Sequence, residues 1–430
     1  MAHATPFAVN GVEKMIYDVR MGPQAVFHGG VIYVVYAANP DGNEGHPHIR
    51  AYDTGSGKWS DPVRVGTVSR YDHHYAPVIW VDGASKLHIL YGCHHTTGTH
   101  LVSSEPGSIA EWDVGPQVAE SISYPRVLPL QDGRHLMYSR TLGHMGFWTF
   151  RLTDDGQHWK ETEPLVDFDR DPQIQWDVWA STYHSVALDS QGTGLHVAFV
   201  TFDDGEGVRK RPHPLYGQYI QAYARFNLYY IHIDIDSRRV TNIEGDEVPP
   251  PVNRAAGEKC MVLDSDRRAT NPPSIVDDGT GKPTLMFPIA SPENAWEGEH
   301  VFYRRRDDHW SRTPVASLNN TWSANWLIPR DDRIDALLTR GPADGSLLPY
   351  GGGQVERWHS ADDGDTCEQD GVFMPDEELI CNNPRPVPTS DGGQLEDSYT
   401  MFGWEGSHGL TKESGLNRGK AFLYHDGEWV

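Results

Sequence analysis

The sequence predicts an all-β protein, a seven-bladed β-propeller that occupies residues 1–430 as a single domain. Three observations favour this fold class: short β-rich segments recur along the chain, Asp-Gly turns separate them, and each group of segments ends near an outer-strand aromatic or valine residue. Stretches with helical periodicity are missing. No apolar run reaches the roughly 18 residues that a membrane span needs, so we expect no membrane partner.

The clearest repeat starts at Tyr75, reads Tyr-Ala-Pro-Val-Ile-Trp-Val-Asp-Gly and then Lys-Leu-His-Ile-Leu-Tyr, and ends at Trp112. Similar repeats start near residues 124 and 271 and end at Trp159 and Trp310. Weaker copies start near Gln24, Tyr183, Trp322 and Pro384 and end near Trp59, Val240, Trp358 and Trp429, respectively. These seven units have the period, roughly 40 to 60 residues, that is typical of propeller blades.

Two stacked β-sandwiches are the alternative fold, but sandwiches do not need Asp-Gly and Trp positions at a regular spacing. No Gly/Ser linker, charge run or low-complexity segment interrupts the repeats, which indicates one circular domain. The last unit ends in Ala421–Tyr424. We expect the segment Met15–Val19 to add a strand to that unit and so remove an open sheet edge.

Charge and cysteine content limit the partners. The formal net charge is −24, from 36 basic and 60 acidic residues, which disfavours nucleic acid and anionic membranes. A polyanionic substrate must therefore meet a local concentration of cations. Four cysteines do not make a disulfide framework in a chain of this length: Cys367 and Cys381 are candidates for one bridge, and Cys93 and Cys260 are expected to be buried thiols. We expect a monomer.

The first residues, Met-Ala-His-Ala-Thr-Pro, contain no apolar signal core. This leaves a cytoplasmic protein or one given without its export signal, and we expect the extracellular or periplasmic case.

Two hairpins carry the candidate chemistry. Paired positions in an antiparallel hairpin are equidistant from the turn. His74 and His94 are centred on the Asp82–Ser85 turn, and Tyr124 and Arg140 are centred on Asp132. Both pairs therefore lie at the open ends of their hairpins, and adjacent blades would bring all four side chains to one axial face.

Imidazoles, a phenol and a guanidinium suit β-elimination from a uronic acid. The guanidinium neutralises the carboxylate, a neutral imidazole removes the C5 proton, and the phenol protonates the leaving oxygen at C4. Glycoside hydrolysis ordinarily uses two carboxyl groups, and Asp72 is the acidic residue among these inner positions. The residues therefore favour a lyase.

The run Asp72–Pro77, a second histidine twenty residues after His74, and Tyr124 sixteen residues before Arg140 resemble the seven-bladed propeller polysaccharide lyases. These include ulvan lyases and the rhamnosyl-α-1,4-glucuronate lyase that trims gum arabic. The resemblance implies a substrate containing rhamnose and glucuronate, His74 and His94 as the histidine pair, Tyr124 as acid/base, Arg140 as carboxylate neutraliser and Tyr183 as an aromatic wall. It departs from the usual Asp-His-Asn pattern, since this chain has His73-His74-Tyr75, and a second histidine follows His94.

Further residues are assigned to substrate binding: His73, His95, Tyr183, Trp179 in an aromatic-rich loop, and Arg209 in the basic insert from Gly205 to Tyr223. Solvated loop or core packing is the plainer interpretation of the last two. No cofactor is expected for catalysis. No histidine spacing resembles a zinc site, and a structural Ca²⁺ or Zn²⁺ is left open.

Two other functions remain in view: a propeller α-L-rhamnosidase that hydrolyses the same bond with histidine, and a non-catalytic lectin. A sialidase is disfavoured because three converging arginines and an acid cannot be assembled from the sequence. We expect His94 to be the essential imidazole and His74 to orient the substrate, since the second-strand end projects into the loop over the axis.

Overall fold

The computed structural model describes residues 4–12, 15–17, 19–39, 44–69, 72–143, 146–160, 162–168, 179–204, 212–217, 225–277, 279–306, 309–341, 351–362, 364–405 and 418–430. Nearly all regular structure in these ranges is β-strand, which confirms the all-β fold class. The helical elements there are short: α2 (Arg254–Gly257), η1 (His73–Tyr75) and η3 (Glu258–Cys260). Within the described ranges, no helix has the length and apolar character needed to cross a membrane.

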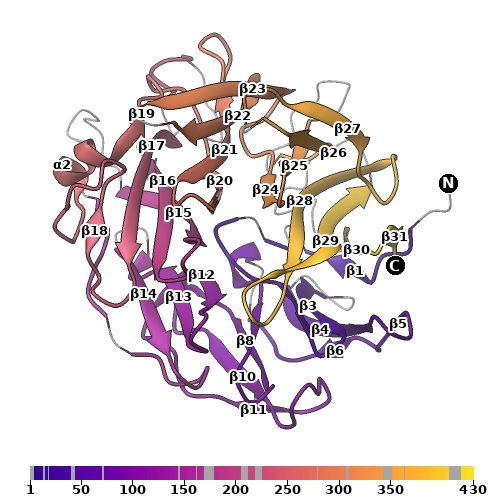
Figure 1. Ribbon diagram of the computed structural model, residues 1–430. Coiled ribbons are helices and arrows are strands. Elements are labelled where there is room, and N and C mark those ends of the chain that lie inside the picture. The colour runs from indigo at the N-terminus through magenta and orange to yellow at the C-terminus, as the bar shows by residue number, and fades with distance from the viewer. Residues whose placement is uncertain are drawn as a thin grey trace.

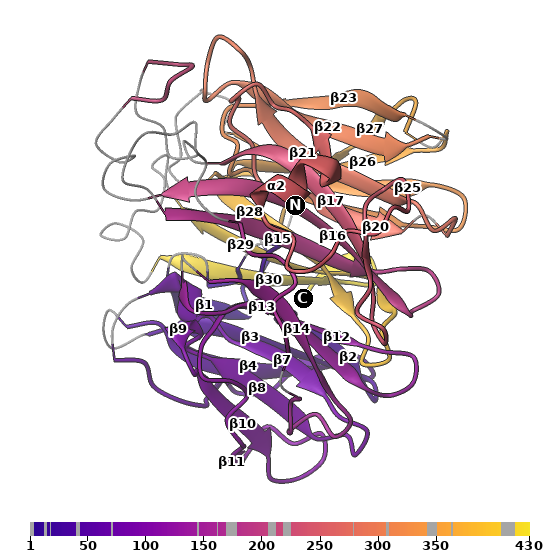
Figure 2. The same cartoon turned by 90° about the vertical axis from the view of Figure 1, so that its left-hand side faces the viewer.

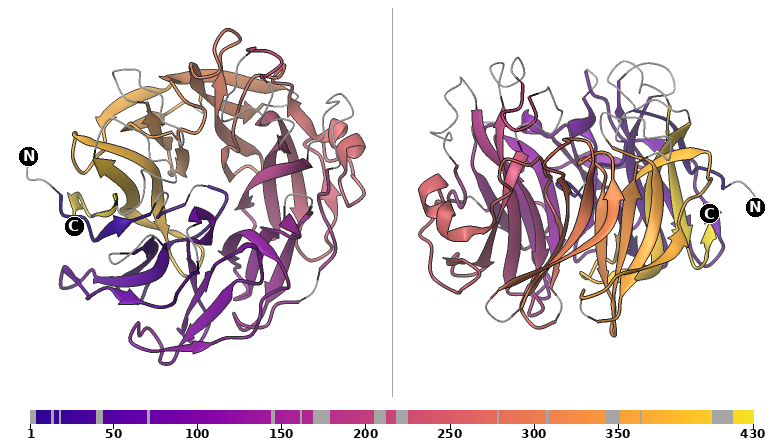
Figure 3. Two further views of the ribbon diagram at one scale, coloured as in Figure 1. Left: turned by 180° about the vertical axis from the view of Figure 1, so that it is seen from behind. Right: turned by 90° about the horizontal axis from the view of Figure 1, so that it is seen from above.

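The sheets stand around a central axis like the blades of a propeller (Figure 1). Figure 2 and the right-hand view of Figure 3 show the same sheets from the side. One sheet comprises β7 (Val78–Val81), β8 (Leu87–Tyr91), β10 (Thr99–Ser103) and β11 (Trp112–Val114). The next comprises β9 (His94–Thr96), β12 (Ile122–Pro129), β13 (His135–Arg140) and β14 (Trp148–Thr153). A third comprises β15 (Trp179–Leu188), β16 (Gly194–Asp204), β17 (Arg225–Asp234), β18 (Val240–Thr241) and β19 (Met261–Leu263). Two more comprise β20 (Ser274–Asp277), β21 (Pro283–Ala290), β22 (Gly298–Arg305) and β23 (Trp310–Leu318); and β24 (Asn325–Pro329), β25 (Ile334–Arg340), β26 (Gln354–Ser360) and β27 (Glu368–Val372).

A ten-stranded sheet joins the two ends of the chain. It comprises β2 (Ala25–His28), β3 (Val31–Ala38), β4 (His46–Asp53), β5 (Lys58–Trp59) and β6 (Val63–Arg64) on one side, β28 (Leu379–Pro388), β29 (Gln394–Glu405), β30 (Gly419–His425) and β31 (Glu428–Trp429) on the other, and β1 (Ala8–Gly11) between them.

The closing strand is β1, which pairs Ala8 with Ala421 of β30 and Gly11 with Ala38 of β3. The expectation that Met15–Val19 would close the ring is therefore wrong. Met15, Ile16 and Tyr17 are instead fully buried. Their apolar character reflects packing in the interior and not pairing with the last sheet.

The innermost strands contact one another around the axis: β2 contacts β7 and β28, β7 contacts β12, and β20 contacts both β15 and β24. Predicted repeat units fall on the observed sheets, from the unit starting near Gln24 on β2 to the unit ending at Trp429 on β31. The Asp-Gly turns are stabilised by hydrogen bonds from the backbone to the aspartate side chain. Asp82 Oδ1, for example, accepts hydrogen bonds from the backbone N–H of Ala84 and of Lys86, each 2.9 Å long.

The register of the β7–β8 hairpin is the predicted one: Val78 pairs with Leu90, and the same register extended places His74 opposite His94. In the next hairpin the register holds from Arg126↔Tyr138 to the turn but shifts at the open end. Arg140 pairs with Ser123 there and not with Tyr124. Tyr124 adopts a φ of 56°, so a bulge corrects the predicted pairing by one residue.

All four cysteines are free thiols, so the Cys367–Cys381 bridge is absent. Cys93 and Cys260 are buried, as expected.

Candidate active site

Asp72 organises two histidines at the start of the β7 blade. Its Oδ1 lies 2.6 Å from His74 Nδ1 and also accepts the His74 backbone N–H at 3.0 Å, capping the η1 turn. Its Oδ2 lies 3.0 Å from His94 Nδ1. The two imidazoles stack with centroids 3.9 Å apart. One carboxylate therefore holds both rings, and both Nδ1 atoms act as donors.

Burial lowers the pKa of His74 to about 3, against the opposing effect of the Asp72 hydrogen bond, and the neighbouring His94 and Arg20 lower it further. The Asp72 carboxyl is also partly buried, which acts to raise its pKa, but the hydrogen bonds from His74 and His94 prevail and hold it well below the usual range. His74 is consequently a neutral imidazole beside an ionised carboxylate at physiological pH. With Nδ1 donating to Asp72, His74 Nε2 carries the lone pair.

The two adjacent histidines differ in environment. His73 is buried and stacks on Tyr17 with centroids 5.8 Å apart. His95 is exposed, lies edge-on to His94 at 4.2 Å, and is fixed by a hydrogen bond from its backbone N–H to Ser123 Oγ. The structure thus brings all four predicted histidines together, with His95 at the open side.

Tyr124 and Tyr183 form a phenol pair on neighbouring innermost strands, β12 and β15. Their hydroxyl oxygens are 3.2 Å apart and their rings meet edge to face. Burial and the neighbouring Tyr183 raise the pKa of Tyr124. The pKa of Tyr183 is lowered because Arg140, Arg225 and Arg20 together outweigh its burial. Tyr124 is therefore the less acidic phenol of the pair, and its ring centroid is 5.6 Å from that of His74.

Three buried arginines surround this pair. Arg140 Cζ is 4.9 Å from the ring centroid of Tyr124. Arg225 Cζ and Arg20 Cζ are 4.6 Å and 4.8 Å, respectively, from the ring centroid of Tyr183. The expectation that three converging arginines could not be assembled is therefore wrong. Arg20 precedes β2 and Arg225 begins β17, so no local sequence signal connects either residue with Arg140.

Arg140 is fully buried, and its Nη1 lies 3.4 Å from Ser181 Oγ. Among the described residues, its Nε and Nη2 have no hydrogen-bond acceptor. Buried donors are nearly always satisfied in native proteins, so two unsatisfied guanidinium nitrogens beside Tyr124 indicate a place for an external acceptor.

Two predicted residues are not tested. Arg209 lies outside the described residues, as does most of the basic insert around it. Trp179 begins β15, but its side chain is not among those described.

Asp72, His73 and His74 offer ligand atoms within 4.8 Å of one another. The Asp72 oxygens already accept hydrogen bonds from two imidazoles. A metal here would displace those protons, so the present geometry fits a histidine-orienting carboxylate better than a cation ligand.

A family model described as a BNR repeat-containing family member matches residues 32–318. The chain belongs to this family. An ulvan lyase of Pseudoalteromonas sp. (strain PLSV) is 22% identical over 405 residues, covering 86% of this chain and 77% of that protein. An ulvan lyase of Nonlabens ulvanivorans is 22% identical over 422 residues, covering 88% and 84% respectively.

A solved PL25 ulvan lyase structure superposes with a TM-score of 0.78 at 19% identity, covering 98% of this chain and 96% of that chain. The lectin BP39L from Burkholderia pseudomallei superposes with a TM-score of 0.52 at 10% identity, covering 93% and 94% respectively. At these identities the superpositions show the propeller fold alone. Together with the ulvan lyase relatives, they confirm the predicted resemblance to propeller polysaccharide lyases.

Proposed function

We propose that the protein is a polysaccharide lyase that cleaves the rhamnosyl-α-1,4-glucuronate bond by β-elimination, leaving an unsaturated uronate. One observation carries this proposal: the buried Arg140 guanidinium, with two nitrogens lacking an acceptor in the described part of the chain, stands beside Tyr124, whose ring centroid is 5.6 Å from that of the Asp72-held His74. The substrate class is supported by the ulvan lyase relatives and by the solved PL25 structure bound to -[GlcA(1-4)Rha3S]-.

In the proposed reaction, Arg140 binds the uronate carboxylate and so stabilises negative charge that develops when C5 loses its proton. The electron pair of the C5–H bond forms the C4–C5 double bond, and the C4–O bond breaks. His74 Nε2 accepts the C5 proton, since this imidazole is neutral and Asp72 stabilises the imidazolium that forms. This assigns the base to His74 and leaves the orienting role to His94, the reverse of the order expected from the hairpins.

Tyr124 protonates the departing C4 oxygen. Its raised pKa keeps the phenol protonated, and Tyr183 fixes the direction of the hydroxyl. Arg20 and Arg225 act on Tyr183, which they hold in a cationic environment. His73, His95 and Tyr183 line the substrate position in this proposal.

We also infer seven blades. The ten-stranded sheet divides into the groups β2–β6 and β28–β31, with β1 as the shared strand, and the other five sheets supply one blade each. The candidate site then lies at the axial end where β7, β12 and β15 begin.

The decisive experiment incubates the protein with an oligosaccharide that ends in rhamnosyl-glucuronate. A lyase produces the ultraviolet chromophore of the 4,5-unsaturated uronate, and the rhamnose that it releases keeps the oxygen that joined the two sugars. A rhamnosidase releases rhamnose with no chromophore, a lectin does neither, and a sialidase acts on another sugar. Binding without the chromophore would overturn the proposal.

We propose that catalysis needs no metal, because Arg140 occupies the neutralising role. Prolonged chelation should leave turnover unchanged, and loss of activity that only added Ca²⁺ or Zn²⁺ restored would assign that role to an ion. An extracellular or periplasmic monomer is the setting that fits a polymeric substrate.

A further inference from the structure

A cavity lies on the propeller axis, lined by residues other than those of the candidate site. Its walls come mainly from the C-terminal parts of the innermost strands, including Val81 of β7, Leu128 of β12, Leu188 of β15, Val276 of β20 and Pro388 of β28. Its volume is about 320 Å³, which is in the range of small-molecule sites. Since Tyr124 and Tyr183 lie nearer the starts of β12 and β15, the same strands connect the candidate site with this cavity.

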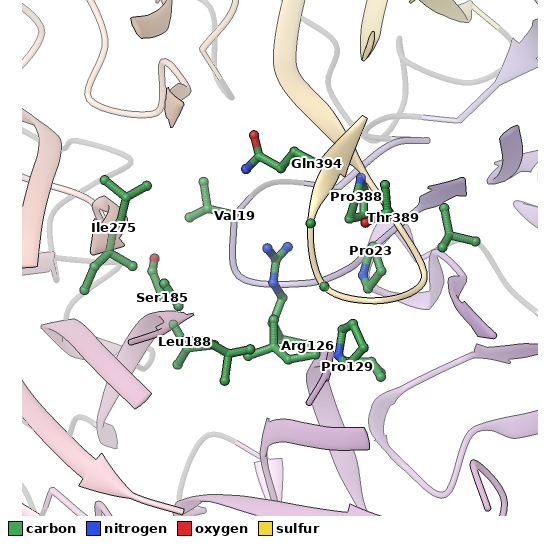
Figure 4. Close-up of a pocket in the computed structure, with 18 of the residues that line it drawn as sticks. Val19, Pro23, Arg126, Pro129, Ser185, Leu188, Ile275, Pro388, Thr389 and Gln394 are labelled. Carbon is green, nitrogen blue, oxygen red and sulfur yellow. The ribbon is translucent and has the colours of Figure 1, made fainter. Parts of the chain in front are cut away.

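Arg126 supplies the positive charge of the cavity. Figure 4 shows its guanidinium pointing toward the middle of the space, from the strand that also carries Pro129. No acidic side chain pairs with it in the described part of the chain, and its buried Nε has no hydrogen-bond acceptor there. The aromatic partner is Trp326, whose ring centroid is 5.4 Å from Arg126 Cζ. Burial lowers the pKa of Arg126 to about 10, which leaves it charged at neutral pH.

The neighbouring Arg385 provides a contrast. Its Nη1 donates to the backbone carbonyl of Met21 at 2.7 Å, and its Cζ is 5.3 Å from the ring centroid of Trp326. Arg385 is thus tied to the fold by a carbonyl. Arg126 faces the cavity without a corresponding hydrogen bond.

The carboxylate that lines the cavity is already occupied. Asp277 Oδ2 is 2.9 Å from His196 Nε2 and accepts the Ser190 N–H at 2.8 Å, and its Oδ1 accepts N–H groups from Gly279 and Gly281. It is therefore not available to neutralise Arg126. Ser185 is 96% buried, lines the same cavity, and its Oγ has no partner among the described residues.

Most of the remaining lining is apolar, from residues such as Pro23, Ile275 and Pro388 (Figure 4). One charged guanidinium neutralises one anionic charge and binds a carboxylate with two parallel hydrogen bonds. Apolar walls favour a ligand whose body is apolar, since a sugar would leave hydroxyl groups without partners.

We propose that this axial cavity is a binding site, distinct from the candidate active site, for a small monocarboxylate with a compact apolar body, whose carboxylate pairs with Arg126. The site depends on neither the lyase reaction nor its substrate.

Isothermal titration calorimetry with benzoate tests the proposal, with benzamide as the uncharged isostere. Benzoate should bind at one site, and benzamide should bind at least about tenfold more weakly because it cannot form the ion pair. Arg126→Met should weaken benzoate binding by at least about tenfold. Arg134→Met is the matched control, since Arg134 lies on the same hairpin but pairs with Asp132 and Asp236 outside the cavity.

Leu188→Trp places a larger side chain in the cavity lining and retains Arg126. It provides a second test, which decides the question if circular dichroism shows that Arg126→Met does not fold. It should also abolish benzoate binding. Arg140→Met separates the two sites and should leave benzoate binding unchanged. Absence of benzoate binding, equal binding by Arg126→Met or Leu188→Trp, or loss of binding in Arg140→Met would each overturn the proposal.

Discussion

At the scale of single residues, Asp72 determines which ring nitrogen of His74 and of His94 is not bound to a carboxylate. Both Nδ1 atoms donate to this one carboxylate, so the rings cannot rotate independently. Asp72 directly precedes His73 and His74 in the sequence, and this adjacency is the sequence feature that points to its contact with His74. Its contact with His94, twenty-two residues away, depends on the β7–β8 register.

Asp72→Asn should lower kcat by about a hundredfold or more, since the amide donates a proton where the carboxylate accepted one and so favours the wrong tautomer. Steady-state kinetics on the rhamnosyl-glucuronate substrate measure the effect. Asp82→Asn is the matched control, because Asp82 holds His88, a buried histidine of the same blade. It should reduce thermal stability and retain kcat, and an equal loss of kcat in both variants would contradict a specific role for Asp72.

The acid limb of the pH profile should lie well below the ordinary imidazole range. The pKa of His74 is lowered to about 3 by burial, so the base stays unprotonated as the pH falls from 7 to 5. We expect kcat/KM at pH 5, measured from initial rates after a pH jump, to stay within about twofold of its value at pH 7. A limb centred near 6.5 would show that another, more exposed imidazole is the base.

Tyr124→Phe removes the proton donor and keeps the ring that Arg140 and Tyr183 contact. Turnover should therefore fall by about a hundredfold or more while KM changes little, because the lost hydroxyl acts on the leaving group in the transition state. Tyr17→Phe is a suitable comparison, since Tyr17 packs against the same ring from 6.2 Å. If both variants retain normal turnover, the proton comes from another group.

At the scale of elements, the turns in the sequence predicted which residues lie opposite each other in the hairpins. The Asp-Gly turn at residues 82–83 fixes the β7–β8 register, so the meeting of His74 and His94 followed from sequence. The bulge at Tyr124 did not, because a left-handed φ at a tyrosine has no sequence signature and is stabilised by its surroundings. The bulge turns the phenol toward Tyr183, which a regular strand would not do.

The arginines show the limit of sequence prediction more clearly. Arg20, Arg140 and Arg225 come from three separate parts of the chain and meet only because the blades close around an axis. A period in the sequence predicts that blades exist, but not which loop residue of one blade reaches a side chain of another. The side chains of the two hairpins, Arg140 included, were therefore predicted to lie together, whereas Arg20 and Arg225 were not predicted.

Closure of the ring through β1 should dominate stability at the level of elements. Removing residues 2–11 deletes the strand that pairs with β30 and β3, along with the stacking of Phe7 on Trp59. The melting temperature should fall by many degrees, since two sheet edges are exposed at once. Removing only residues 2–5 leaves the hydrogen bond from the Phe7 N–H to the Ala421 carbonyl. This shorter truncation should change the melting temperature little. Similar melting temperatures for both truncations would show that closure does not depend on β1.

At the scale of the whole molecule, buried neutral histidines make the fold sensitive to acid. Burial lowers the pKa of His100, His135 and His300 to about 4 each. These values are below those of the unfolded chain, so the unfolded state binds more protons between about pH 6.5 and 4. The free energy of unfolding is therefore fully present above that window and falls as the pH drops through it, by up to roughly 3 kcal/mol per histidine.

Urea unfolding at pH 7, 6, 5 and 4.5 measures this dependence. His300→Gln should be less stable than the parent at pH 7 but lose less stability on acidification, since Gln does not titrate. A free energy of unfolding that is constant from pH 7 to 4.5 would contradict the expectation. Carboxyl groups with lowered pKa values, such as Asp277 at about 2, affect the free energy of unfolding mainly below about pH 4, and so mainly below the pH range in which these histidines titrate.

The pairing of β1 with β30 also constrains the order of events during synthesis. β1 precedes every other strand described here and its partner β30 follows nearly all of them, so the sheet that contains both cannot be completed until β30 has been translated. The intervening blades can form as they emerge, but the axis around which Arg20, Arg140 and Arg225 gather is enclosed only at the end. A nascent propeller of this kind should therefore acquire its catalytic competence in one late step, after its blades, when β1 pairs with β30 (Figure 1).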